Sequence, residues 1–251
     1  MGLFNMISIV VLNWNTAELL INLYKSIINN SSENVEVIIV DNGSESADFN
    51  KLYDNVIKYN PCIIKSEENK GFAAGNNLGL KHVTGDLIVF INSDIEIKEK
   101  NWDVKFRNFF KNDIGVVGCA YHPLKWTKDG RFKIQPLVEE SIISETVQGA
   151  FFAVPKNILN ELKEKDGHFF DENFKFAHYE ETDMQLRIME LGYKTLWIPL
   201  KHEHHHNQSA TKKNGYKLNE YIQNEVQFKQ NSEKNRQLLI KKHKLFFEGC
   251  E

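Results

Sequence analysis

Carboxylates are concentrated at one point in the second half of the chain. Glu180, Glu181 and Asp183 fall within four residues, directly after a stretch rich in aromatic side chains. Capping preferences and the helix dipole explain one or two acidic residues at the start of a helix. Three of them together also suit a metal site or a general base, because neighbouring like charges raise one another's pKa. These three residues are therefore candidates for catalysis.

Two aspartates each follow an apolar run typical of a buried strand, and in open α/β sheets ligands bind at that end of the strands. Asp41 follows residues 35–40. Together with Asn13 it could bind a base or a ribose, or it could stabilise an Asx turn. Asp94 follows residues 86–91. Its carboxylate suits Mg²⁺ or Mn²⁺, which would offset the charge of a diphosphate leaving group, although a simple turn is the commoner meaning of that spacing.

Histidines form a third candidate site, in the interior of the sequence. His202, His204, His205 and His206 lie within five residues and are followed by Ser209. An internal metal ligand is one interpretation of this cluster, and an exposed polar loop is the other. An affinity tag is not expected, because the cluster is not terminal.

Composition indicates an ordinary globular protein. The 251 residues are 41% hydrophobic and 26% charged, with a formal net charge of −3, so no strong field favours nucleic acid as a partner. Cys62, Cys119 and Cys250 form no C-x-x-C pair, and their odd number argues against a disulfide framework. The apolar run after Met6 is too short to span a bilayer and lacks a basic leader. We expect a cytoplasmic protein, soluble or peripheral to the membrane.

Strand and helix patterns alternate through the first hundred residues. Strands are predicted at residues 7–12, 35–40, 62–65 and 86–91, and helices at 52–58 and 73–81. Another helix should begin at Asn15, with Asn15 as its cap and Glu18 completing a capping box. This order predicts a mostly parallel sheet with right-handed crossovers.

The second half of the sequence is less regular. Strands are predicted at residues 116–120, 151–154 and 195–198, and a helix at 181–191 that ends before Gly192. Residues 121–148 show no periodicity and are predicted to be loops, and we expect acceptor recognition in this segment and in the C-terminal helices. Residues 214–247 have the composition of one or two helices, and the best candidate for a domain boundary lies near residue 210.

Taken in order, seven segments resemble glycosyltransferase family 2, whose members have the GT-A type fold. The resemblance spans roughly residues 6–210. It is carried by ISIVVLNWNTAELLINLYKSI, VIIVDNGS, NKGFAAGNNLGL, LIVFINSD, QGAFFAVPKN, HFFDENFKFAHYEETDMQLRIMELGYK and HHHNQS. The N-terminal V-x-N-W-N form looks most like bacterial rhamnosyltransferase-type members that build surface polysaccharides.

The resemblance implies a role for each candidate. Asp41 would bind the nucleoside, Asp94 and His204 would bind Mn²⁺ or Mg²⁺, and Glu181 would be the general base, supported by Glu180 and Asp183. His204 lies five residues before Ser209 as the pattern requires, with His202 and His206 as alternatives. The remaining donor-binding positions implied by the resemblance are Asn13, Asn15, Asn42, Gly71, Asn76, Asn92, Ser93 and Gly149.

The sequence departs from the family pattern at two positions. Asn92 stands where the first Asp of an Asp-x-Asp motif is often found, as it does in many rhamnosyltransferase-like members. Glu181 stands where the family usually has Asp. Because a Glu side chain is one methylene longer, the base could instead be Glu180.

The implied protein is an α/β enzyme of the GT-A type, with a Rossmann-like, mostly parallel central sheet flanked by helices. Residues 1–210 would form the catalytic domain, and residues 211–251 a helical extension that packs on it. The reaction would be an inverting transfer from a UDP- or dTDP-sugar to a hydroxyl of a saccharide or lipid-linked acceptor, in polysaccharide synthesis.

Three alternatives stay open. A nucleotidyltransferase would share the sheet and the metal, but residues 13–16 hold no Gly-rich basic loop. A non-catalytic nucleotide-sugar-binding module is the second. The third concerns the tail, where basic residues interleave with Leu238, Leu239, Ile240, Leu245, Phe246 and Phe247. These apolar side chains could pack on the catalytic domain or contact an anionic membrane.

Overall fold

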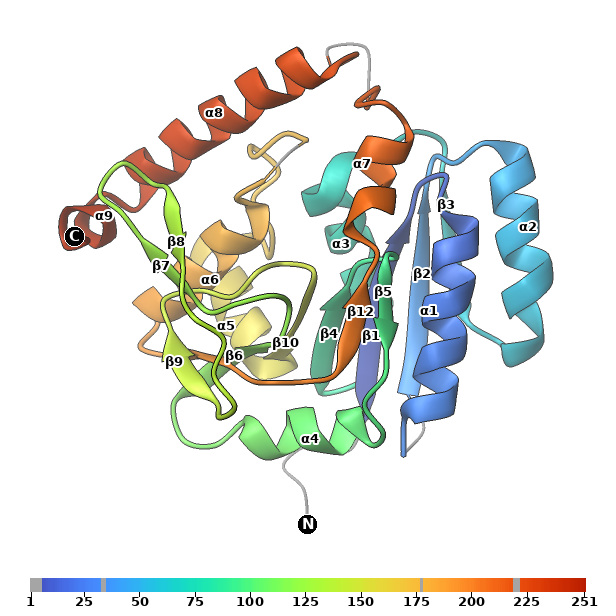
Figure 1. The fold of residues 1–251 in the computed structure, drawn as a ribbon, viewed down its shortest axis with the longest axis horizontal. Coiled ribbons are helices and arrows are strands. Elements are labelled where there is room, and N and C mark those ends of the chain that lie inside the picture. The colour runs from blue at the N-terminus through green and yellow to red at the C-terminus, as the bar shows by residue number, and fades with distance from the viewer. Residues whose placement is uncertain (1–5, 33–34, 177, 219–221) are drawn as a thin grey trace.

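The computed structural model describes residues 6–32, 35–176, 178–218 and 222–251 (Figure 1). Among these residues, eight strands form the central sheet, in the order β3-β2-β1-β4-β10-β6-β11-β9. Their bounds are β1 Ile7–Asn13, β2 Val35–Asn42, β3 Cys62–Ser66, β4 Leu87–Ile91, β6 Ile114–Gly118, β9 Ile142–Ser144, β10 Phe151–Pro155 and β11 Lys194–Trp197.

The N-terminal half of the sheet is parallel. β1 pairs with β2 on one side and β4 on the other, and β2 pairs with β3, all in parallel. β10 is antiparallel to both β4 and β6, whereas β11 runs parallel to β6. The predicted α/β class with a mostly parallel sheet is therefore confirmed, and the strand ends of β1, β2 and β4 lie at one edge.

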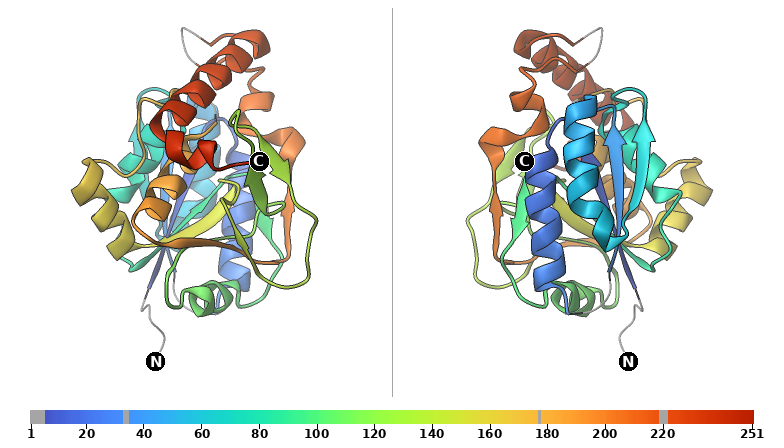
Figure 2. Two further views of the ribbon diagram at one scale, coloured as in Figure 1. Left: turned by 90° about the vertical axis from the view of Figure 1, so that its left-hand side faces the viewer. Right: turned by 90° about the vertical axis from the view of Figure 1, so that its right-hand side faces the viewer.

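Helices cover both faces of this sheet because its strands alternate between two apolar clusters. Ile7, Ile9 and Val11 of β1 pack with α1 (Ala17–Asn30), α2 (Ser46–Val56) and α4 (Trp102–Phe109). Val10 packs on the opposite face with α3 (Gly71–Leu80), α5 (Lys156–Asp166) and α6 (Glu180–Glu190). The right-hand view of Figure 2 shows α1 and α2 side by side over the parallel half of the sheet.

Two small sheets lie beside the main one. β5 (Ile95–Ile97) pairs with β12 (His202–His204), and β7 (Leu124–Trp126) pairs with β8 (Phe132–Ile134), each antiparallel. Short helical turns complete the chain: η1 (Ile57–Tyr59), η2 (His206–Gln208) and α7 (Ala210–Lys213). The expectation that residues 121–148 are only loops was wrong, since β7, β8 and β9 lie there. Each is three residues long, too short to show a period in the sequence.

The start of α1 also differs from the expectation. The helix begins at Ala17, and Thr16 occupies the cap position without a side-chain cap bond. Asp48 of α2 accepts a hydrogen bond from the Ala17 N–H instead, at 3.1 Å. Asn15 was therefore the wrong cap. Its backbone is left-handed (φ 55°), and its side chain accepts a hydrogen bond from the Glu45 N–H.

The C-terminal segment forms α8 (Glu225–Lys242) and α9 (Lys244–Glu248), and Figure 1 shows α8 running past α6 to the C-terminus. Leu239 and Phe247 are fully buried in a third apolar cluster with Trp126, Phe174 and Leu186. These two apolar residues of the tail are therefore packed against the rest of the protein, whereas Leu245 is 86% exposed. No helix in the described ranges combines the length and apolar character needed to cross a membrane.

Candidate active site

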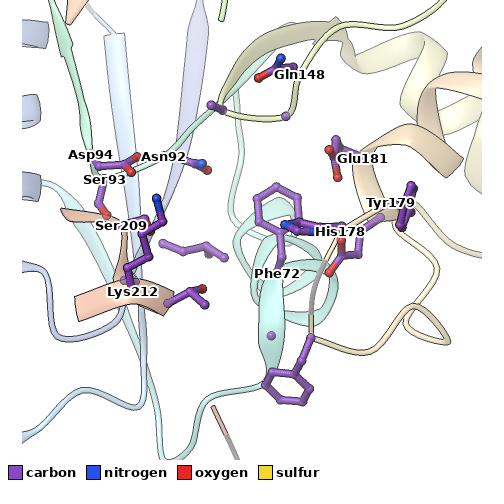
Figure 3. Close-up of a pocket in the computed structure, with 18 of the residues that line it drawn as sticks. Phe72, Asn92, Ser93, Asp94, Gln148, His178, Tyr179, Glu181, Ser209 and Lys212 are labelled. Atoms are coloured by element: carbon purple, nitrogen blue, oxygen red, sulfur yellow. The ribbon is translucent and has the colours of Figure 1, made fainter. Parts of the chain in front are cut away.

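A cavity of about 640 Å³ opens where β1, β2 and β4 end (Figure 3). Asn92, Ser93 and Asp94 lie on one side of it, directly after β4. Glu180 and Glu181, in the first turn of α6, lie on the other. The cavity therefore brings together two candidate motifs that are separated by more than eighty residues of sequence.

Asp94 and His204 are adjacent because of strand register. β12 pairs with β5 so that His204 faces Ile95, the residue after Asp94. His204 Nε2 lies 3.4 Å from Asp94 Oδ2 and 3.2 Å from the Tyr121 hydroxyl. His202 is two residues away along β12, bonds the Leu200 carbonyl through Nδ1 at 2.8 Å, and does not line the cavity. The side chain of His206 lies outside the described part of the chain.

The Asp94 carboxylate has the chemistry of a metal ligand. Asp94 is only 3% exposed, and its Oδ1 has no hydrogen-bond partner within the described residues. A buried carboxylate oxygen without a partner is costly unless a cation or a donor satisfies it. One carboxylate and one imidazole at the same wall of an open cavity fit Mn²⁺ or Mg²⁺, whose further ligands could come from a diphosphate and water.

Glu181 faces the cavity from α6 and packs against Gly149. A Cβ at position 149 would lie 2.5 Å from Glu181 Cγ, so the glycine leaves room for this side chain. Burial raises the pKa of Glu181 above that of an ordinary glutamate, and backbone N–H groups, including those of Gly149 and Thr182, oppose the rise. A carboxylate whose pKa is raised towards neutrality is a better proton acceptor near pH 7.

Glu180 also lines the cavity and is 2% exposed. Adjacent residues of an α-helix point about 100° apart, so the two glutamates present their carboxylates in different directions. The structure brings both to the cavity and leaves the choice of base as a prediction.

Asp183 lies away from the cavity, in an ion-pair cluster between α6 and the C-terminal helices. Its carboxylate accepts hydrogen bonds from Arg187 Nε at 2.8 Å, Lys242 Nζ at 2.8 Å and His243 Nε2 at 3.0 Å. Burial alone would raise the pKa of Asp183, but the bond from His243 and the charges of Arg187 and Lys242 lower it to about 2. Its described contacts are those of a structural anchor, and it is not among the residues that line the cavity.

Asp41 and Asn13 are fully buried and bonded to each other. Their register in the β1–β2 ladder sets them side by side, and Asn13 Nδ2 donates to Asp41 Oδ1 at 2.9 Å. Asp41 Oδ2 also accepts from the Ser44 N–H, three residues further along the chain, at 3.4 Å. Neither residue lines the cavity, whereas the next residue, Asn42, does. Nucleoside binding by Asp41 stays a prediction.

The other predicted donor-binding residues divide into two groups. Asn42 and Gly71 line the cavity together and are joined by a hydrogen bond from Asn42 Nδ2 to the Gly71 carbonyl. Asn15 and Asn76 do not line it. Asn15 Nδ2 donates to Asn214 Oδ1 at 3.1 Å, and Asn76 Nδ2 donates to the Phe72 carbonyl inside α3.

A loop of unusual backbone conformation leads into α6. Phe176, His178 and Tyr179 have φ values of 38°, 69° and 80°. Side chains of this kind rarely adopt the left-handed region, and such strain persists only where surrounding structure holds it. Asn235 of α8 does so by donating to the carbonyls of Lys175 and His178 at 3.1 and 3.2 Å.

These supporting contacts were not foreseen, because nothing in the sequence links α8 to this loop. Several residues lining the cavity were also missed. They include Leu12, Trp14, Tyr121, Trp126, Phe132, Gln148, His178, Thr211, Lys212, Tyr216 and Phe228. Aromatic side chains dominate this group, and their clustering arises only when β7, β8, α7 and α8 come together in space.

The chain is similar in sequence to several glycosyltransferases. GlyG, a glycosyltransferase of Streptococcus pneumoniae, is 27% identical, and the match covers 66% of this chain and 62% of the relative. AmsB, the amylovoran biosynthesis glycosyltransferase of Erwinia amylovora, is 26% identical over 78% of this chain and 69% of the relative. YfnE, an uncharacterized glycosyltransferase of Bacillus subtilis, is 28% identical, and the match spans 66% of this chain but only 42% of YfnE.

Solved structures share the fold. GalNAc-T7, crystallised with UDP, GalNAc and Mn²⁺, superposes with a TM-score of 0.69 at 17% identity, over 80% of this chain and 44% of that one. The mannosyltransferase PcManGT of Pyrobaculum calidifontis, in complex with GDP-Man and Mn²⁺, superposes with a TM-score of 0.60 at 18% identity. The superposition covers 77% of this chain and 54% of PcManGT. The sequence profile of glycosyl transferase family 2 matches residues 8–177. The match spans more than half of the sequence, and the chain belongs to this family.

Proposed function

We propose that this protein transfers a sugar from a nucleotide diphosphate donor to an acceptor hydroxyl. One observation carries the proposal: a single cavity has the Asp94–His204 pair on one wall and Glu181, with its raised pKa, on the other. The first wall suits the diphosphate end of the donor. The second suits deprotonation of an acceptor that approaches from the opposite side.

In the proposed reaction Glu181 accepts the proton of the acceptor hydroxyl. The acceptor oxygen forms a bond to the anomeric carbon, and the bond from that carbon to the phosphate oxygen breaks, with its electron pair leaving on the diphosphate. Attack from the face opposite the phosphate inverts the anomeric centre. Asp94 and His204 would hold Mn²⁺ or Mg²⁺, and a divalent ion there offsets the negative charge of the leaving diphosphate.

The donor is proposed to be a UDP- or dTDP-sugar, and the acceptor a saccharide or lipid-linked hydroxyl in polysaccharide synthesis. Mn²⁺ bound with UDP in one related structure and with GDP-Man in the other supports a nucleotide-sugar donor, and the amylovoran biosynthesis role in the name of AmsB supports polysaccharide synthesis. We also propose residues 1–210 as the catalytic domain and residues 211–251 as an extension that helps to complete the cavity. Peripheral membrane contact is not proposed, because Leu239 and Phe247 are buried in the third apolar cluster and Leu238, Ile240 and Phe246 pack partly buried against it.

The test is transfer and donor hydrolysis in the presence and absence of Mn²⁺, with UDP-, dTDP- and GDP-sugars. Release of nucleoside diphosphate that requires the ion and is lost in the Glu181→Gln variant would support a transferase. Binding of the donor without turnover, under every acceptor condition tested, would instead support a non-catalytic binding module. Release of pyrophosphate from a nucleoside triphosphate and a sugar phosphate would identify a nucleotidyltransferase.

A further inference from the structure

Lys212 stands at the same wall of the cavity as Asp94. It belongs to α7 and lines the cavity together with Ser209 and Thr211. Figure 3 shows Ser209 and Lys212 on the side of Ser93 and Asp94, away from Glu181 and Tyr179.

Contacts on both sides of α7 keep it there. Before it, the His205 N–H donates to the Asp94 carbonyl at 2.8 Å, which extends the β5–β12 pairing. After it, the Asn214 side chain accepts a hydrogen bond from Asn15, in the loop that follows β1. The short helix is therefore attached to the strand ends that form the donor wall, and the position of Lys212 follows from that attachment.

The charges of the cavity single out Lys212. Among the described residues that line the cavity it is the sole lysine or arginine, whereas Asp94, Glu180 and Glu181 are carboxylates. No described carboxylate lies within ion-pair distance of Lys212 Nζ, although other lysines near the surface, such as Lys98 and Lys242, are paired. Because carboxylates outnumber basic side chains in this cavity, it would repel a diphosphate unless cations offset their negative charge. The ammonium group of Lys212 lies where it can offset that charge.

We propose that Lys212 binds the diphosphate of the nucleotide donor and stabilises it as the leaving group. This inference rests on the proposed function. When the bond from the anomeric carbon to the phosphate oxygen breaks, that oxygen gains negative charge, and the Lys212 N–H groups donate to the diphosphate without transferring a proton. Charge-assisted hydrogen bonds of this type are stronger than those between neutral groups.

The test compares Lys212→Met with Lys213→Met. Both lysines are exposed and adjacent in α7, but only Lys212 lines the cavity. Affinities for UDP, dTDP and GDP, and for uridine, thymidine and guanosine, are measured by calorimetry with and without Mn²⁺. We expect Lys212→Met to weaken binding of the preferred diphosphate about tenfold or more, to leave nucleoside binding unchanged, and to reduce the salt dependence of diphosphate binding. Lys212→Arg should restore part of the affinity.

Equal, small effects of Lys212→Met and Lys213→Met on diphosphate binding would overturn the assignment, as would an equal loss of nucleoside and diphosphate affinity in Lys212→Met. A wild-type protein that binds the nucleotides but does not turn over any donor would contradict the proposed function while leaving the role of Lys212 in binding intact. Failure of the wild type to bind any of the diphosphates would contradict both.

Discussion

The two walls of the cavity are built by different means. The wall that carries Asp94 is formed where strands end, and its key distances follow from ladder register, as in the pairing of His204 with Ile95. The wall that carries Glu181 is the first turn of a helix that follows the left-handed residues Phe176, His178 and Tyr179. It is held by Asn235 of α8 and by His243, the residue that follows α8, both more than fifty residues further along the chain.

This difference bears on how each wall should respond to substitution. Asp94 follows a central strand that is packed in the core, so around Asp94 the residues that touch the ligands should matter most. The second wall depends on long-range polar contacts. Substitutions in the C-terminal helices should therefore change catalysis without touching the substrate.

The largest effect is expected at the first wall. Asp94→Ala should remove Mn²⁺-dependent transfer to below detection, because the carboxylate oxygen without a partner is the main ligand that the chain offers there. The fold should survive, because Asp94 follows β4 rather than lying inside it. The measurement is Mn²⁺ binding, transfer rate and thermal unfolding. Glu203→Gln is the control, since this exposed residue lies in the adjacent strand and does not line the cavity. Near-normal transfer by Asp94→Ala would disprove the metal assignment.

Glu181→Gln should lower turnover by roughly 10²–10⁴-fold while leaving donor affinity nearly unchanged. Because burial raises the pKa of Glu181, the wild-type rate should begin to fall, as the pH is lowered, at a higher pH than an ordinary glutamate would cause. Glu181→Asp should retain some activity. Glu180→Gln is measured in parallel, and loss of turnover there with retention in Glu181→Gln would transfer the role of base to Glu180.

Asn235→Leu tests the support of the second wall. The variant removes the hydrogen bonds from Asn235 to the Lys175 and His178 carbonyls, and loss of buried hydrogen bonds costs about 1–3 kcal/mol. We expect faster hydrogen exchange in residues 175–180 and a turnover lower by about tenfold, with the donor Kd unchanged. Lys234→Ala, at the exposed neighbouring position, should change neither quantity. An equal loss in donor affinity would mean that α8 supports the whole cavity rather than the Glu181 wall.

The smallest effect is expected from Asp183→Asn, which should change the free energy of unfolding. Its pKa is about 2 in the folded protein and should approach the ordinary 3.8 on unfolding, so the ionised carboxylate stabilises the fold above pH 4 and loses that contribution as the pH falls towards 2. The shift corresponds to about 2 kcal/mol at neutral pH. The free energy of unfolding should therefore differ most between the wild type and Asp183→Asn above pH 4, and the difference should narrow at pH 3. A constant difference from pH 6 to pH 3 would contradict the lowered pKa.

Much of the fold and part of the site could be predicted from the sequence because their signals are local. The apolar runs that become β1, β2 and β4 place Asp41 and Asp94 at strand ends without knowledge of any other residue. The start of α6 and the presence of Glu180 and Glu181 in its first turn follow from local helix signals in the same way. The family motifs selected His204 within its cluster, and strand register places it beside Asp94.

Only the tertiary structure determines how the pKa values of neighbouring carboxylates differ. Glu181 and Asp183 are two residues apart, yet the pKa of one is raised by burial at the cavity while that of the other is lowered to about 2 by His243, Arg187 and Lys242. The same holds for Lys212, whose position depends on the pairing of β5 with β12. Such contacts join residues dozens of positions apart and leave no period in the sequence, because they depend on where folded elements meet rather than on the preference of any one segment.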